Sequence, residues 1–224
     1  MRNYHAAFSH VITYISNIPY LYRYEDKKYI DDFFENGNLF ISSFQNYKKY
    51  KDNELGDVDE GTSFNVANIA DDKQITTYTT IDNNNYTFCT STIYEKKLLD
   101  KFSRNSVFRI ADPLNFILEL TRSIQRVQGV LHGNCIYVDN RIIQKKYPQI
   151  DESLLINQQG ELNMNNAKII SDEIQGVDAF FFKKKNYQEQ SEYRIIWQTD
   201  REISGGIIIK CPEAVKYCQR IEFD

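Results

Sequence analysis

Short stretches rich in Tyr, Phe, Thr and Ile recur along the whole chain, and they are the feature that most constrains its fold. Among 224 residues there are 16 Tyr and 14 Phe, and aromatic and β-branched side chains suit the half-buried surface of a β-sheet. Helical patterns lie between these stretches, but strand and helix do not alternate regularly and the sequence contains no Gly-rich phosphate loop. The sequence therefore predicts an α+β fold rather than a doubly wound parallel sheet.

Two predicted helices have recognisable ends. Residues 26–35 carry apolar side chains at helical spacing and precede Gly37, the residue type that most easily adopts the left-handed conformation that ends a helix. Asp112 and Pro113 supply an N-cap acceptor and a first-turn proline for the second helix. A further helix is expected over residues 1–17. The inward side of the second helix is expected to carry Leu114, Ile117, Leu118, Thr121, Ile124 and Val127.

Residues 74–81 and 86–92 are predicted to form the two strands of a hairpin. Both are rich in Thr, Tyr and Ile, and residues 82–85, Asp-Asn-Asn-Asn, tolerate the positive φ of a tight turn. The remaining strand candidates are residues 21–24, 39–44, 134–138, 179–182, 193–197 and 206–210.

We predict a single domain over residues 1–224, because the length suits one full core and no linker is long enough to divide the chain. Residues 150–175 are polar and rich in Asn and Gln, which predicts a surface insertion with one helix near its end. Residues 48–61 are polar and acidic and predict a loop. That loop is either functional or a solvated excursion.

Composition also narrows the setting. The formal net charge of −4 argues against a general attraction to nucleic acid as the basis of function. No window approaches the ~18 consecutive apolar residues that a spanning helix needs, so we expect no membrane segment. The first residues lack the apolar run of a secretory signal. The cysteines, at positions without disulfide or metal spacing, are expected to be reduced thiols in the cytoplasm, with no metal site.

Arg23 belongs to the predicted strand Leu-Tyr-Arg-Tyr at residues 21–24, where it shares a face with Leu21. An arginine among apolar side chains needs a partner. A diphosphate fits its planar guanidinium in a bidentate way, and a buried salt bridge to an internal carboxylate is the alternative.

The second pattern is the hydroxyl triplet Thr90, Ser91 and Thr92, which follows Phe88. Hydroxyls beside a carboxylate can donate to it and favour its charged form. Threonine is also a common strand residue, so the triplet could equally be structural.

The third pattern is Gln190-Ser191-Glu192. Gln190 and Glu192 are two apart in a predicted strand, so their side chains are expected on one face, with Ser191 and Tyr193 on the other. Glu192 is the strongest catalytic candidate. The alternative is that Glu192 pairs with a neighbouring lysine or arginine on an exposed sheet face.

Together, the three patterns resemble the arginine–hydroxyl–glutamate class of mono-ADP-ribosyltransferases. In that class the first strand reads like Leu-Tyr-Arg-Gly, the second Phe-x-Ser-Thr-Ser and the third Gln/Glu-x-Glu. The chain differs in having Tyr24 at the glycine position and in exchanging Ser and Thr within the triplet. The resemblance implies an ADP-ribosyltransferase-like fold of two packed antiparallel or mixed sheets with surrounding helices, and NAD+ as co-substrate.

The resemblance also implies a role for each pattern. Arg23 and Tyr24 would contact the cofactor, with Arg23 on the NAD pyrophosphate. The triplet at residues 90–92 would contact the cofactor too, with Thr90 and Ser91 bracing the nicotinamide ribose and Glu192. Glu192 would hydrogen-bond the ribose 2′-hydroxyl and stabilise the oxocarbenium-like centre. Gln190 would orient the acceptor.

In this class the loop before the third strand commonly selects the target. Here that loop contains Lys183, Lys184, Lys185 and Tyr187, side chains that could hold a phosphate backbone and stack a base. An RNA or DNA base is therefore slightly favoured over a protein side chain as acceptor. The alternative is that the lysine run is a solvated turn.

A second resemblance concerns context. Residues 39–44, 56–61 and 182–185, ahead of residues 189–194, look like a broad bacterial family found in antiphage and toxin–antitoxin settings. This resemblance implies a toxin or defence effector with an antitoxin protein as a further partner.

Two other functions remain open. The cleft could bind a nucleotide without cleaving it, in a non-catalytic sensor subunit of a defence system. Alternatively, Asp57, Asp59 and Glu60 could be ligands of a metal-dependent nuclease if other carboxylates met them in space.

Overall fold

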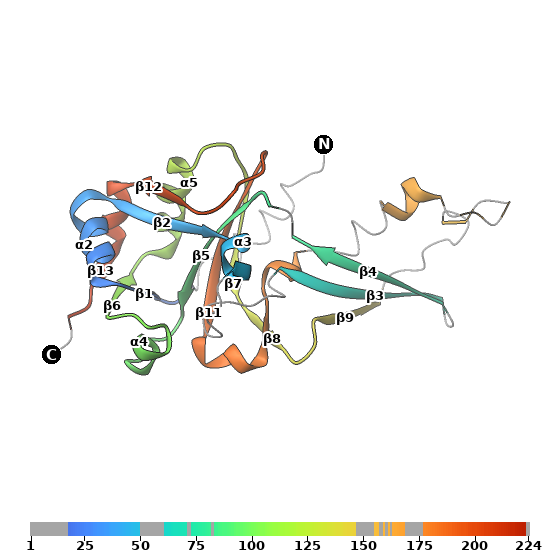
Figure 1. The fold of residues 1–224 in the computed structure, drawn as a ribbon, viewed down its shortest axis with the longest axis horizontal. Helices are drawn as coiled ribbons and strands as arrows, with labels where there is room; N and C mark the ends of the chain where they lie inside the picture. The colour runs from blue at the N-terminus through green and yellow to red at the C-terminus, as the bar shows by residue number, and fades with distance from the viewer. Residues whose placement is uncertain are drawn as a thin grey trace. The chain divides into compact units, whose positions relative to one another are not determined.

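A computed structural model describes residues 18–49, 61–70, 73–81, 83–146, 155–156, 159, 161, 163–168 and 177–222. The chain has a mixed α+β fold with several largely antiparallel sheets and few helices (Figure 1). It divides into two compact units, the first made of residues 1–60, 82–135 and 186–224 and the second of residues 61–81 and 136–185. The helix predicted over residues 1–17 lies outside the described residues.

The first unit is built on one eight-stranded sheet. Its path runs β12–β2–β5–β1–β6–β13, and β11 pairs with both β5 and β7. All these neighbours are antiparallel. The strands are β1 (Leu21–Glu25), β2 (Asn38–Ser43), β5 (Asn85–Ser91), β6 (Ser106–Ile110), β7 (Val127–Asn134), β11 (Glu192–Thr199), β12 (Ile207–Lys210) and β13 (Cys218–Arg220).

Strand β5 forks the sheet. One of its edges pairs with β11 along its whole length, from Asn85 to Ser91. The other edge pairs with β2 through Tyr86 and Thr87, and with β1 through Ser91. The partner of β5 therefore changes from β2 to β1 around Cys89, and the two partner strands diverge there.

One hydrophobic core lies against this sheet. Phe33 comes from α2 (Lys27–Asn36) and Phe116 from α5 (Pro113–Ser123), and both belong to the same buried cluster as Phe88 and Trp197 of the strands. The indole N–H of Trp197 donates to the hydroxyl of Thr121 at 2.8 Å, so its polar atom is satisfied in the core. The described residues of the unit also form α3 (Phe44–Lys49), α4 (Lys97–Lys101), most of the 3-10 helix η3 (Lys185–Gln190) and the 3-10 helix η4 (Pro212–Tyr217).

Helix α5 begins as predicted but ends early. The carboxylate of Asp112 accepts from the backbone N–H of Asn115 at 3.1 Å, which is the expected N-cap. The helix ends at Ser123, and Val127 already belongs to β7. Leu114 and Leu118 are exposed, so their predicted inward orientation is wrong. The predicted burial of Ile117 and of Ile124, the residue after the helix, is confirmed. The other buried residues of the helix, Pro113, Phe116 and Leu120, are not in the predicted stripe.

Helix α2 ends at Gly37, as the sequence predicts. Gly37 has φ 75° and its N–H donates to the carbonyl of Phe33 at 2.8 Å. A Cβ added to Gly37 would lie 2.5 Å from the backbone nitrogen of Pro212, closer than real contacts allow. The position therefore needs glycine for both its backbone conformation and its space.

We expect Gly37→Ala to lower the free energy of unfolding by about 2–3 kcal/mol, because the substitution adds left-handed strain to a backbone clash. Gly205→Ala is the matched control, since its added Cβ would lie 3.7 Å from the nearest atom. Urea unfolding of both variants measures the difference. Equal losses in the two variants would contradict this account.

The second unit contains two smaller sheets. The first is β4–β3–β9, formed by β3 (Thr62–Ala70), β4 (Lys73–Thr80) and β9 (Ile142–Lys146). The second is the parallel pair of β8 (Ile136–Val138) and β10 (Phe182–Lys184). Between them in the chain lies the 3-10 helix η2 (Asp178–Phe180). Of the predicted insertion at residues 150–175, the structure describes residues 155–156, 159, 161 and 163–168.

The predicted hairpin of residues 74–81 and 86–92 is wrong, although both segments are strands. β4 pairs with β3, and β5 belongs to the eight-stranded sheet. The partners of β5 are more than 40 residues away along the chain, and local turn residues carry no information about them.

Across the described residues, no helix combines the length and hydrophobicity needed to span a membrane.

Candidate functional site

The fold brings the three sequence patterns together on adjacent strands. Ser91 of β5 pairs with Tyr22 of β1 on one side and with Glu192 of β11 on the other. Arg23 follows Tyr22 directly. The strands that carry the arginine, hydroxyl and glutamate patterns therefore lie side by side at Ser91, although they are far apart in the chain. By strand alternation, Arg23 projects from the face opposite to that of Tyr22, Ser91 and Glu192.

Glu192 lies in a buried ion pair. Directly paired residues of antiparallel strands share a face, so Glu192 lies on the face of Ser91. Arg194 lies two residues further along β11, and its Nε is 2.6 Å from Oε1 of Glu192. The side chains of Arg194 and Glu192 are only 2% and 6% exposed. Glu192 therefore pairs with an arginine, as the alternative interpretation held, but in the interior rather than on an exposed face.

Arg194 was not among the predicted site residues. The signal for it was present, because a residue two positions after Glu192 in a strand projects from the same face. Its guanidinium also lies over the ring of Phe44 in α3, 5.8 Å from the centroid. Arg194 thus holds the Glu192 carboxylate from a fixed position.

Gln190 and Glu192 do not share a strand, so that prediction is wrong. Gln190 is the last residue of the 3-10 helix η3 (Lys185–Gln190), and β11 begins at Glu192. Ser191 between them has φ 43°, in the left-handed region that is costly for a residue with a Cβ. This backbone turn breaks the alternation that would have put the two side chains on one face.

The hydroxyl triplet holds the main chain around Glu192. Each of its three hydroxyls donates to a backbone carbonyl close to Glu192 in sequence, rather than to the Glu192 carboxylate as expected. The bonds join Thr90 Oγ1 to Tyr193 O (3.0 Å), Ser91 Oγ to Gln190 O (2.8 Å) and Thr92 Oγ1 to Ser191 O (3.3 Å). The triplet therefore positions the segment that carries Glu192.

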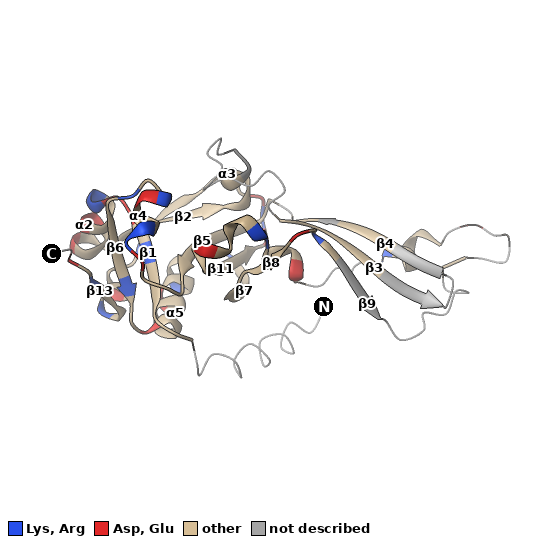
Figure 2. Cartoon of the chain, turned by 90° about the horizontal axis from the view of Figure 1, so that it is seen from below, with Lys and Arg blue, Asp and Glu red and all other residues tan. Residues whose placement is uncertain are grey.

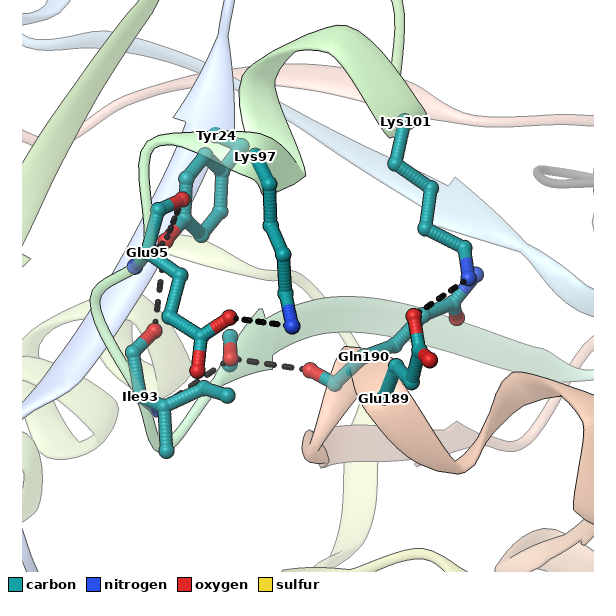
Figure 3. A network of polar contacts seen from close by, with 8 residues as sticks. Tyr24, Ile93, Glu95, Lys97, Lys101, Glu189 and Gln190 are labelled. Atoms are coloured by element: carbon teal, nitrogen blue, oxygen red, sulfur yellow. Dashed lines mark hydrogen bonds and ion pairs between the residues drawn. The ribbon is translucent and has the colours of Figure 1, made fainter.

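The loop after β5 is held by the hydroxyls of Ser91 and Tyr24 (Figure 3). The Ser91 hydroxyl accepts from the N–H of Ile93 at 3.2 Å, and the Tyr24 hydroxyl accepts from the N–H of Glu95 at 2.9 Å. Tyr24 is buried against α4 and also donates to the carbonyl of Ile93. Burial raises the pKa of its phenol. The Tyr24 hydroxyl therefore holds this loop in place, and its contact with a cofactor stays a prediction.

Two ion pairs lie beside this loop. Lys97 lies 2.8 Å from the carboxylate of Glu95, and Lys101 of α4 lies 3.3 Å from that of Glu189 in η3 (Figure 3). The second pair links α4 to the segment just before Gln190.

Arg23 lies at the fork of the sheet. Its Nη1 donates to the carbonyl of Cys89 at 2.7 Å, its Nη2 lies 2.8 Å from the carboxylate of Glu25, and its guanidinium covers the ring of Phe88. The salt bridge to an internal carboxylate, the alternative partner of Arg23, is therefore present. The Arg23 side chain is 17% exposed, so one part of it remains accessible.

Tyr47 of α3 belongs to the same cluster, and no sequence pattern indicated it. Burial raises the pKa of its phenol well above the usual value, and the neighbouring Cys89 thiol acts in the same direction. The Arg23 charge opposes this shift, whereas the Glu192 charge adds to it. Tyr47 therefore lies within electrostatic range of both charged residues and is expected to stay neutral at physiological pH.

The lysine run does not form an exposed basic loop. Lys183 and Lys184 lie in β10, where Phe182 and Lys183 are buried. Tyr187 is also buried, at 6% exposure. Lys185 is exposed and lies 3.4 Å from the carboxylate of Asp139. Pairing of β10 with β8 draws this segment into the second unit, which the charge pattern could not reveal.

The acidic residues proposed for a nuclease, Asp57, Asp59 and Glu60, lie outside the described residues. Within the described part of the chain, no three His, Cys, Asp or Glu side chains gather as metal ligands would.

On the opposite face of β11, Tyr193 contacts His132 of β7, with 2.6 Å between the phenol oxygen and Nδ1. Burial lowers the pKa of His132 below its ordinary value of 6.5, so the folded protein holds the neutral ring. The unfolded chain takes up a proton more readily. The stability that His132 contributes is therefore present above about pH 6.5 and declines as the pH falls below it.

We expect His132→Asn to flatten this decline. Urea unfolding of the wild type and the variant between pH 8 and pH 5 measures the free energy of unfolding of each protein. The two values should converge as the pH falls. Curves that stay parallel would show that His132 does not titrate with folding.

Comparisons with known protein families, with curated proteins and with solved structures find no match for this chain.

Proposed function

We propose that the chain is an NAD+-dependent mono-ADP-ribosyltransferase that acts as a toxin or defence effector in the cytoplasm. The observation that carries this proposal is the register around Ser91, which places the arginine strand and the glutamate strand on its two sides. Chance similarity in three short patterns gives no reason for them to meet on adjacent strands. On this proposal, the forked sheet is an ADP-ribosyltransferase-like fold.

The proposed reaction transfers ADP-ribose. The bond between nicotinamide and C1′ of the ribose breaks, and its electron pair leaves with nicotinamide. A nucleophile of the acceptor then forms the new bond to C1′ and loses its proton to solvent or a nearby base. The carboxylate of Glu192 hydrogen-bonds the ribose 2′-hydroxyl and stabilises the positive charge that develops on the ribose.

The surrounding residues support these roles. Arg23 offers a planar guanidinium to the pyrophosphate, which fits two parallel hydrogen bonds. Arg194 favours the charged form of Glu192 and fixes its orientation through the 2.6 Å contact. The hydroxyl triplet holds the main chain on both sides of Glu192, which limits how far the carboxylate can move.

The acceptor is a macromolecule. The burial of Lys183 and Tyr187 removes two of the four residues that favoured a nucleic acid, so the test must treat protein and nucleic acid equally. The purified protein is incubated with NAD+ labelled in the adenylate and with a cell extract, and the labelled product is divided between protease and nuclease. The proposal is supported if nicotinamide is released and if either protease or nuclease removes the label from the macromolecule. It is refuted if no nicotinamide is released and no label is transferred.

We expect Arg23→Lys to weaken NAD+ binding roughly tenfold, because lysine keeps the charge but loses the two parallel hydrogen bonds. Arg109→Lys is the matched control, since Arg109 lies on the neighbouring strand β6 opposite Tyr22 and is bonded to Gln219. Calorimetric titration with NAD+ measures both. Equal affinities for the two variants would remove Arg23 from the site.

One observation favours the non-catalytic alternative. Glu192 is 5% exposed and held by Arg194, which suits a residue that shapes a nucleotide site without reacting. The same assay separates the two functions, because a sensor would bind NAD+ and release no nicotinamide.

A further inference from the structure

The carboxylate of Glu25 bridges two guanidinium groups. Oε2 of Glu25 lies 2.8 Å from Nη2 of Arg23, and Oε1 lies 3.2 Å from Nε of Arg104. Arg104 also contacts Asp26, with 3.1 Å between Nη1 and Oδ2. Two cations are thus held side by side by one anion, with one oxygen for each.

The fold places these groups from three directions. Arg23 and Glu25 are two apart on β1 and project from the same face. Arg104 lies in the turn between α4 and β6, where its N–H donates to the carbonyl of Leu99 at 2.8 Å. The next residue, Asn105, accepts from the N–H of Lys27 at the start of α2 at 2.7 Å. The turn is therefore attached to α2, and Arg104 is held beside β1.

The cluster remains accessible to a ligand. The side chains of Arg23, Glu25 and Arg104 are 17%, 15% and 26% exposed. Figure 2 shows basic and acidic residues intermixed around α2, α4 and the nearby end of β1. Ion pairs that reach solvent exchange partners readily, because water compensates each charge during the exchange.

A phosphate could take the place of this carboxylate. Both groups can present two oxygens to the nitrogens of one guanidinium, and each phosphate of a pyrophosphate carries one negative charge, as a carboxylate does. At the start of α2, the backbone N–H of Asp26 donates to Oε1 of Glu25 at 3.2 Å, and the positive end of the helix dipole lies next to this carboxylate. The geometry suits two neighbouring phosphates, one on each arginine.

We propose that Glu25 occupies the position of a phosphate between Arg23 and Arg104, and that Arg104 is the second guanidinium that binds the diphosphate of a dinucleotide. This inference rests on the proposed function, since it assigns further residues to the same NAD+ site. Binding moves Glu25 away from the two arginines, so Glu25 competes with the ligand. Glu25 and Asp26 pair with the two arginines in the free protein. A diphosphate can contact both arginines at once, so the site favours it over a monophosphate.

The test measures the affinity of the full chain for ADP-ribose and for AMP by calorimetry. We expect Glu25→Gln to bind ADP-ribose roughly tenfold more tightly, because the competing charge is gone. We expect Arg104→Gln to bind ADP-ribose roughly tenfold more weakly and AMP about as the wild type does, because AMP has a single phosphate. Glu35→Gln and Arg122→Gln, on exposed positions of α2 and α5, are the controls.

The outcomes separate this inference from the proposed function. If the wild type releases nicotinamide but Glu25→Gln and Arg104→Gln bind ADP-ribose as their controls do, the inference is overturned and the proposed function stands. If Arg104→Gln weakens AMP as much as ADP-ribose, the assignment of one phosphate to each arginine is wrong. If neither the wild type nor Glu25→Gln binds ADP-ribose and no nicotinamide is released, both fail.

Discussion

Glu192→Gln is expected to lower kcat for nicotinamide release from NAD+ by at least about 100-fold, because the amide cannot stabilise the developing positive charge. Glutamine keeps the size of the side chain and an oxygen that can still accept from Arg194. The expected loss is therefore one of charge rather than of shape. The measurement is the rate of nicotinamide release at saturating NAD+.

The matched control is Glu189→Gln, the same chemical change three residues earlier on an exposed side chain of η3 that pairs with Lys101. We expect its rate to stay within about twofold of the wild type, because a surface ion pair contributes little. ADP-ribose binding and urea unfolding of both variants check that the site remains formed. Full activity in a folded Glu192→Gln protein would exclude the proposed mechanism.

Arg194→Met is expected to lower the free energy of unfolding by about 3–5 kcal/mol, since it leaves the buried Glu192 carboxylate without its ionic partner. The side chain of Arg194 is only 2% exposed, so water cannot replace the lost contact. Methionine fills similar space, which limits any contribution from a cavity. Urea unfolding at pH 7.5 measures the change.

Arg122→Met provides the matched control, because Arg122 also pairs with a glutamate, Glu119 at 2.8 Å, but is 71% exposed. We expect it to cost less than about 1 kcal/mol. A comparable loss in both variants would mean that burial does not set the strength of the Glu192 pair.

The pH dependence of Arg194→Met gives a second reading. Without Arg194, the buried carboxylate favours its neutral form, so the folded variant holds a proton more tightly than the unfolded chain does. Its stability deficit should therefore be smallest near the ordinary carboxyl range, about pH 4–4.5, and grow as the pH rises. A deficit that does not change with pH would point to lost packing instead.

Local signals were reliable where a short segment decides its own conformation. Gly37 ends α2 because the last turn of a helix needs a left-handed residue, and Asp112 starts α5 because a free N–H needs an acceptor. The strand character of β1 and β5 was also predictable from their aromatic and threonine content. The wrong prediction that Gln190 and Glu192 share a strand also has a local cause, the positive φ of Ser191. The sequence gives no sign of it, because the residue is a serine and not a glycine.

The order of the arginine, hydroxyl and glutamate patterns can be read directly from the sequence, as can the strand character of the segments around Arg23, Ser91 and Glu192. Three features emerge only from the folded chain. Ser91 pairs with both neighbouring strands, the hydroxyls of the triplet donate to backbone carbonyls, and Glu192 and Arg23 pair with Arg194 and Glu25. The reason is that strand register and the burial of charges depend on contacts between segments distant in sequence. A pattern within one segment can indicate that a side chain needs a partner, but the packed sheet determines which partner it has.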